Sequence, residues 1–178
     1  MDLDLVCHPD TPPRTVKSVK VQVDRDARTL RLLYFVEGDP GRIRLPAPQK
    51  ACRADGLWQT TCFELFVRDD SQGYREFNFS PSSQWAAYRF RAYREGREAL
   101  ALNEPPIVRL FEPEPFHSML RASLRVEIAP GASVGLSAII EETDGTKSYW
   151  ALAHPPGDRP DFHDPACFAL ELPPAAQS

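Results

Sequence analysis

The fold is decided by the stretch Thr61-Cys-Phe-Glu-Leu-Phe-Val67, which is followed by Tyr74-Arg-Glu-Phe-Asn-Phe-Ser80 and Gln84-Trp-Ala-Ala-Tyr-Arg-Phe-Arg-Ala-Tyr93. In each segment apolar residues recur at every second position, as they do when one face of a β-strand is buried. The connection Ser80-Pro-Ser-Ser83 consists of turn-forming residues. The three segments therefore predict consecutive antiparallel strands joined by hairpins.

Working outward, the same pattern recurs on both sides of this region. We expect further strands at 19–23, 30–36, 107–111, 119–128, 133–141, 148–152 and 168–172. The chain contains 18 prolines, many in pairs between these segments, and proline is excluded from helix interiors and central strands. The best helical candidate, 93–102, would form one or two turns. The sequence thus predicts an all-β antiparallel β-sandwich with roughly nine or ten strands and little helix.

The length and the net charge of the chain limit the classes of function that it can have. The chain has 178 residues, of which 42% are hydrophobic, so we expect residues 1–178 to form one domain with one core. The formal net charge is −4 and the basic residues are scattered, which argues against a nucleic-acid partner. Asp2 and Asp4 stand where a secretory signal would be basic, and the sequence has no apolar run of membrane-spanning length. We therefore expect a cytoplasmic protein without membrane contact.

The face opposite the predicted core points to a ligand. If Phe63, Phe77 and Tyr88 represent the core layer, the alternate positions form a mixed aromatic and charged layer. That layer contains Glu64, Tyr74, Glu76, Asn78, Trp85, Arg89, Arg91 and Tyr93. A sugar ring stacks its C–H face on aromatic rings and presents hydroxyls to carboxylate, amide and guanidinium groups. The alternative is the solvated side of an antiparallel sheet.

Metal and haem sites are less consistent with the sequence. His154, Asp161, His163 and Asp164 are residue types that bind zinc or iron, but their spacing matches no established metal motif. Turn formation in a proline-rich loop explains them equally well. His117 and Met119 are two residues apart on one strand, so they cannot bind a haem iron from opposite sides. We expect neither a metal nor a cofactor.

The segment Gly131-Ala-Ser133-Val-Gly135 fits the G-x-S-x-G motif of α/β-hydrolases. That motif requires a turn between a strand and a helix. Here the serine follows Pro130 and leads directly into an alternating strand, so we interpret the motif as a hairpin turn. The sequence predicts no catalytic residue at this position.

Several of these segments together resemble a known family. Gly56-Leu-Trp58-Gln-Thr-Thr-Cys-Phe-Glu64, Tyr74-Arg-Glu-Phe-Asn78-Phe-Ser-Pro, Tyr149-Trp150-Ala-Leu-Ala-His154-Pro and Pro160-Asp-Phe-His163 are similar to segments of bacterial DOMON-like proteins. Those proteins are related to carbohydrate-binding module family 9. The resemblance spans about Val16 to Leu172 and implies a DOMON-like sandwich, of immunoglobulin-like or jelly-roll type, that binds a small ligand without catalysis.

The resemblance also implies a site. Trp58 and Trp150 would clamp a sugar, Glu64 and either Arg89 or Arg91 would bind its hydroxyls, and Asn78 would assist. The loop that carries His154 and His163 would border the pocket. One alternative is an enzyme that uses Glu64 or Glu76 with one of the two histidines as acid and base. Another is a protein-interaction module in which the aromatic residues anchor a partner.

Overall fold

The computed structural model describes residues 1–68, 73–114, 117–129 and 131–172. These residues form twelve strands and three short 3₁₀ turns, Pro40–Arg42, Leu57–Gln59 and Pro165–Cys167. The strands are β1 (Asp2–Cys7), β2 (Ser18–Arg25), β3 (Leu30–Glu37), β4 (Cys62–Arg68), β5 (Tyr74–Phe79), β6 (Trp85–Phe90), β7 (Glu98–Ala99), β8 (Ile107–Glu114), β9 (His117–Leu124), β10 (Ser133–Glu141), β11 (Lys147–Ala151) and β12 (Leu170–Glu171). In this part of the chain, no helix has the length and apolar character needed to cross a bilayer.

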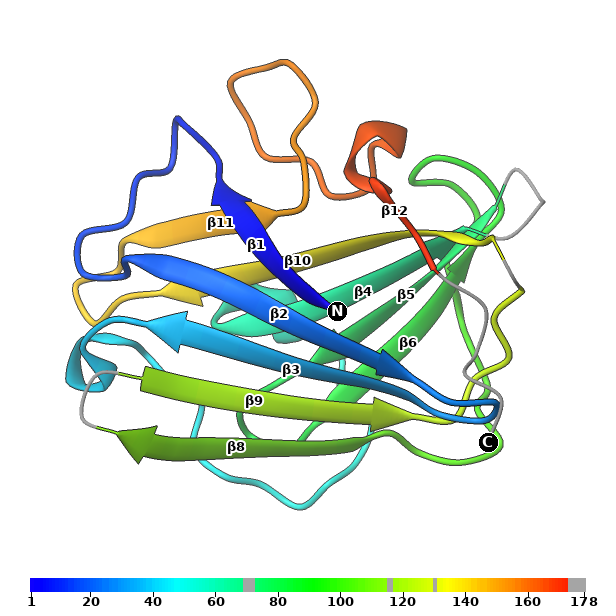
Figure 1. Ribbon diagram of the computed structural model, residues 1–178, viewed down its shortest axis with the longest axis horizontal. Helices are drawn as coiled ribbons and strands as arrows, with labels where there is room; N and C mark the ends of the chain where they lie inside the picture. Colours follow the sequence, from blue (N-terminus) through cyan, green and yellow to red (C-terminus); the bar gives the residue numbers. More distant parts are fainter. Residues whose placement is uncertain (69–72, 115–116, 130, 173–178) are drawn as a thin grey trace.

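The strands form two facing layers of one curled antiparallel sheet (Figure 1). The front layer has the order β1-β2-β3-β9-β8, and the rear layer has the order β7-β6-β5-β4-β10-β11. β1 joins them, because its first half pairs with β2 while Val6 and Cys7 pair with β11. The all-β sandwich expected from the alternation is therefore confirmed. β1 was not predicted, and residues 93–102 contain the short strand β7 instead of a helical turn.

The two layers enclose an apolar interior. β2 contributes its valines and β3 contributes Leu30 and Leu32, and they form one cluster with residues of β4 and β5. The largest side chains with almost no exposure include Tyr34, Phe63, Phe77 and Phe79. The Tyr34 hydroxyl donates a hydrogen bond of 2.8 Å to the backbone oxygen of Glu64, so this buried polar atom is satisfied. Burying each such ring stabilises the fold by about 1.5–3 kcal/mol.

The pairing of β5 with β6 corrects one prediction. Ala87 lies opposite Phe77 and Tyr88 lies opposite Glu76. Residues that are directly opposite share a face, so Ala87 belongs to the interior and Tyr88 to the outer face of the rear layer. The turn that ends at Ser83, where φ is 76°, sets this register. The assignment of Tyr88 to the core and Arg89 to the polar face was one residue out of phase.

The G-x-S-x-G segment leads into a strand, as predicted, but the expected hairpin turn is wrong, because β9 pairs with β3 and β8 whereas β10 pairs with β4, β11 and β12. Ser133 is the first residue of β10 and lies opposite Arg68 of β4, with no helix after it among the described residues. Gly135 has a packing role, since a Cβ there would lie 2.9 Å from the backbone oxygen of Cys167. The motif is therefore part of a strand and not a nucleophile elbow.

Candidate functional site

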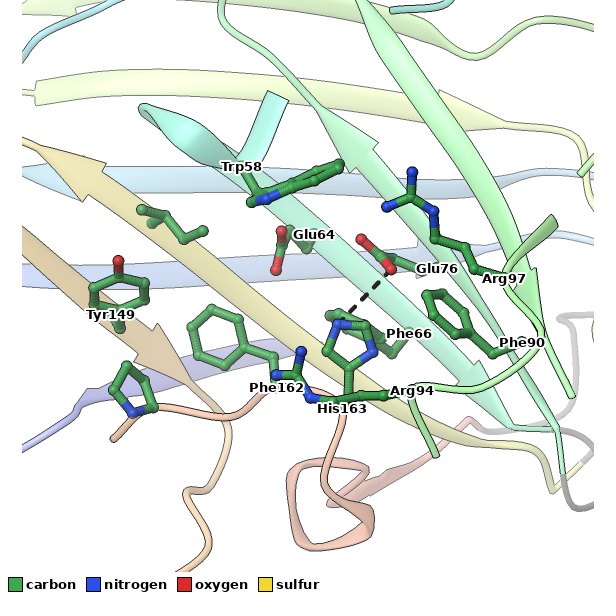
Figure 2. A pocket seen from close by; sticks show the side chains of 12 residues that line it. Trp58, Glu64, Phe66, Glu76, Phe90, Arg94, Arg97, Tyr149, Phe162 and His163 are labelled. Atoms are coloured by element: carbon green, nitrogen blue, oxygen red, sulfur yellow. Dashed lines mark ion pairs between the residues drawn. The ribbon is translucent and has the colours of Figure 1, made fainter. Parts of the chain in front are cut away.

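A pocket of about 350 Å³ opens on the outer face of the rear layer (Figure 2). Its floor is formed by β4, β5 and β10, and its walls come from β6, β11, the Leu57–Gln59 turn and the loops that carry Arg94 and His163. The lining side chains are Trp58, Glu64, Phe66, Glu76, Phe90, Arg94, Arg97, Ile139, Tyr149, Pro160, Phe162 and His163. The volume lies in the range of small-ligand sites.

Strand alternation places two carboxyl groups in the floor. Glu64 of β4 shares the outer face with its cross-strand partners, Asn78 and Ser137. Glu76 lies two residues before Asn78, on the same face of β5. Glu64 is 3% exposed and Glu76 is 5% exposed. Both point into the space below Trp58 (Figure 2).

Each carboxyl group has one neutral hydrogen-bond donor. The Ser137 hydroxyl donates to Glu64 at 3.0 Å, and the Asn78 amide donates to Glu76 at 2.7 Å. Burial, followed by the charge of Glu76, raises the pKa of Glu64 to about 8. Burial also raises the pKa of Glu76, although the Asn78 hydrogen bond and the charges of Arg97 and Arg94 oppose that shift. The raised pKa favours the protonated form of Glu64, which can donate a hydrogen bond as well as accept one.

His163 completes the floor as a neutral imidazole. Its Nδ1 lies 2.7 Å from the Tyr74 hydroxyl, and its Nε2 lies 4.0 Å from Glu76 Oε2 (dashed line in Figure 2). Burial, with the charge of Arg94 as a second cause, lowers the pKa of His163 to about 4. The ring packs edge-on against Phe66 and Phe90 at centroid distances of 5.2 Å and 5.1 Å.

A loop after β6 supplies the guanidinium groups. Arg94 pairs with Asp161 at 2.6 Å, and its backbone N–H donates to the Tyr74 hydroxyl at 3.2 Å. Tyr93 also donates a hydrogen bond to Asp161. The loop at 91–97 is thus tied to the loop that carries His163, across the mouth of the pocket.

Aromatic rings form the walls. The Arg97 guanidinium lies over the rings of Tyr88, at 4.6 Å, and Trp58, at 5.4 Å. Tyr149 and Phe162 line the far side, with ring centroids 6.0 Å apart (Figure 2). Trp58 is half-buried, on the 3₁₀ turn that follows Gly56. The walls therefore offer apolar ring faces above a floor in which two carboxyl groups lie beside Phe66 and Ile139, and stacked guanidinium groups retain hydrogen-bonding capacity at their edges.

The structure brings three of the expected site residues to the pocket, namely Trp58, Glu64 and His163. Asn78 lies just beneath it, fully buried, and orients Glu76. Arg94, Arg97, Tyr149 and Phe162 were not predicted. Tyr149 could have been recognised, because it alternates with Trp150 along β11 and so faces the opposite side.

The other expected residues lie elsewhere. Trp150 is opposite Ala138 on the interior face, and its indole N–H donates to Ser148 at 2.9 Å, so it cannot form a wall of the pocket. Arg89 is exposed on the other face of β6. Arg91 is exposed and packs beside Gly96.

His154 lies outside the lining. One of its ring nitrogens is 2.9 Å from the Val6 backbone oxygen, and its ring meets His8 edge-on at 5.0 Å. Across the described ranges, no cluster of three or more His, Cys, Asp or Glu side chains could hold a metal ion.

No family model matches the chain, and no curated protein matches it. Solved structures do. A candidate carbohydrate-binding protein from Bacteroides uniformis matches with a TM-score of 0.68 and 19% identity over 94% of this chain and 83% of that one. A carbohydrate-binding module of family 9 from Caldicellulosiruptor kristjanssonii, solved with glucose, matches with a TM-score of 0.48 and 12% identity over 83% and 72% of the two chains. The first likeness shows a shared β-sandwich fold.

Proposed function

We propose that this protein binds carbohydrate without catalysis, in the pocket on the outer face of the rear layer. The observation that carries the proposal is the combination of aromatic walls with a floor of buried, hydrogen-bonded carboxyl groups. Trp58 offers a ring face to the C–H side of a sugar. Glu76 can accept a hydrogen bond from a sugar hydroxyl. The protonated Glu64 can either donate a hydrogen bond to a hydroxyl oxygen or accept one from a hydroxyl group. A fold shared with a candidate carbohydrate-binding protein supports this proposal.

The clamp that we propose differs from the one implied by the family resemblance. Its walls are Trp58 on one side and Tyr149 with Phe162 on the other, because these three side chains line the same cavity. Arg97 lies at its edge, stacked on Trp58, where its N–H groups can reach a hydroxyl that also contacts Glu76. We also propose that this protein is related to DOMON-like proteins, because the segment around Trp58 and Glu64 resembles theirs.

A titration of mono- and disaccharides by isothermal calorimetry tests the proposal. We expect heat of binding with at least one sugar, a loss of affinity of at least about tenfold in Trp58→Ala, and a similar loss in Glu76→Gln. Arg89→Ala is the matched control, because Arg89 is exposed on the opposite face of β6 and should leave affinity unchanged. No binding across the panel, or equal binding in Trp58→Ala, would overturn the proposal.

A second candidate function, acid–base catalysis on a glycoside, is favoured by one observation. A carboxyl group with a pKa of about 8 stands near a second carboxyl group, as in sites where one acid donates a proton and the other stays ionised. A reducing-sugar assay separates the two functions. Catalysis requires turnover that disappears in Glu64→Gln, whereas binding alone gives no turnover with either protein.

A further inference from the structure

Strand β8 forms the free edge of the front layer (Figure 1). It pairs along one side with β9. Among the described residues, no backbone hydrogen bond from 107–111 reaches any other segment. An edge strand of this kind presents unpaired N–H and C=O groups that can accept another strand.

A groove of about 1010 Å³ lies beside this edge. Residues 105–111 line one side and residues 45–51 the other. Its lining includes Pro46, Pro48, Pro81, Pro105 and Pro106. Proline has no backbone N–H, so the prolines of the far wall cannot continue a ladder with β8. The groove is at the upper end of the usual volume of a small-ligand site, about 300–1,000 Å³, and is open enough for a chain segment.

Two arginines lie side by side on β8 and β9, and Arg109 is part of the lining of the groove. Arg109 of β8 lies directly opposite Arg121 of β9, and like charges in this position repel. No hydrogen bond or ion pair joins either guanidinium group to the described residues. In contrast, Lys20 and Arg31 on the same layer pair with aspartates. Arg121 is held over the ring of Phe111 at 5.5 Å.

Exposed apolar side chains flank the two arginines. Ile107 is 60% exposed and Phe111 is 38% exposed, and they precede and follow Arg109 by two residues, on the same face of β8. The surface therefore alternates apolar, basic and apolar groups along an unpaired strand edge.

We propose that β8 binds an extended acidic segment of a partner protein, which adds to the sheet as a further strand. Its carboxylates would pair with Arg109 and Arg121, and its apolar side chains would cover Ile107 and Phe111. This interaction surface lies on the other layer of the sandwich from the pocket and does not depend on the proposed sugar binding.

Charge selects the acidic partner over a second copy of the chain. A two-fold interface through β8 brings the same patch from both subunits together, which would gather four guanidinium groups. An acidic strand meets the arginines with the opposite sign.

Fluorescence anisotropy with the full chain tests the proposal. The probe is a fluorescein-labelled peptide of alternating Glu and Val, and a Lys and Val peptide of equal length is its counterpart. We expect the acidic peptide alone to bind, with affinity falling at least about tenfold in Arg109→Glu/Arg121→Glu. That variant keeps a like-charged pair, so the repulsion within the fold is preserved. Arg89→Glu/Arg91→Glu, on exposed positions of the rear layer, is the matched control and should bind normally.

Amide hydrogen exchange tests the added strand itself. We expect exchange at 107–111 to slow when the acidic peptide is bound, because new backbone hydrogen bonds form there. Absence of peptide binding, equal binding of the basic peptide, or unchanged exchange at 107–111 would overturn the proposal. A dimer that dissociates in Arg109→Glu/Arg121→Glu during sedimentation would also overturn it and assign the edge to a second copy.

Discussion

The two faces of the rear layer are similarly buried at β4 and β5 but differ in chemistry, because the outer face carries two carboxyl groups among apolar side chains. Its interior face carries Phe63 and Phe77, which contribute to the apolar core. Its outer face carries Glu64 and Glu76 on the same two strands, with similarly low exposure. Burying a carboxyl group costs free energy of folding, whereas burying a phenyl ring stabilises the fold. The interior face therefore serves stability, whereas the carboxyl groups of the outer face keep a folding cost that the proposed ligand binding would explain.

The largest difference between the two faces should come from their tryptophans. Trp150→Ala removes a ring that is 5% exposed in the interior, so we expect a loss of about 3–5 kcal/mol in the free energy of unfolding. Trp58→Ala removes a half-buried ring, and we expect at most about half of that loss. Urea unfolding monitored by circular dichroism measures both values. Equal losses would break the distinction between a structural face and a binding face.

The buried acid should make stability depend on pH. The pKa of Glu64 is about 8 in the folded protein and ordinary, near 4.5, when unfolded. The folded protein therefore holds more protons between these values, and stability decreases as the pH rises from about 5 to above 8. We expect Glu64→Gln to remove much of this decrease. At pH 8.5 the variant should gain about a few kcal/mol in the free energy of unfolding, which is the order of magnitude that corresponds to the raised pKa of Glu64.

The acid side of the same profile has a different origin. The pKa of His163 is lowered to about 4, so the unfolded chain takes up its proton first and stability falls as the pH drops below about 6.5. Thermal melts from pH 4 to 9 follow both limbs. If the melting temperature of Glu64→Gln falls with alkaline pH as steeply as that of the unsubstituted protein, Glu64 is not a buried acid in solution.

The smallest effect should come from the ion pair at the mouth of the pocket. Asp161→Asn weakens the hydrogen bonds to Arg94 and Tyr93, and we expect a loss of about 1 kcal/mol, because Asp161 is mostly buried while Arg94 is half exposed. Glu104→Gln, in a fully surface pair with Arg125, is the control and should cost a few tenths of a kcal/mol. The two melting curves give the comparison, and an equal effect would show that the two loops are not held together by Asp161.

Local alternation made much of the fold predictable. The faces of β4 and β5 followed directly from the period of two in Phe63, Leu65, Phe77 and Phe79. In β6 nearly every residue is apolar or aromatic, so alternation alone could not distinguish its two faces. The register of the hairpin decided the matter, and it depends on the positive φ of Ser83.

The candidate site was predictable only in part. Glu64 and His163 lie in the pocket, as the family resemblance implied. Arg94 and Arg97 lie on an irregular loop, and nothing in its sequence pattern reveals that Asp161 draws it across the pocket. The expectation that Trp150 forms a wall is wrong, because the alternation of β11 places Tyr149 and Trp150 on opposite faces.

The most direct test of the central claim is an NMR titration of the three tryptophan indole N–H signals with a panel of sugars. Trp58 lines the pocket, whereas Trp85 and Trp150 belong to the interior cluster. We predict that a bound sugar shifts the Trp58 signal in a saturable way and leaves the Trp150 signal in place. A panel that moves none of the signals, or that moves Trp150 and not Trp58, would contradict carbohydrate binding in this pocket.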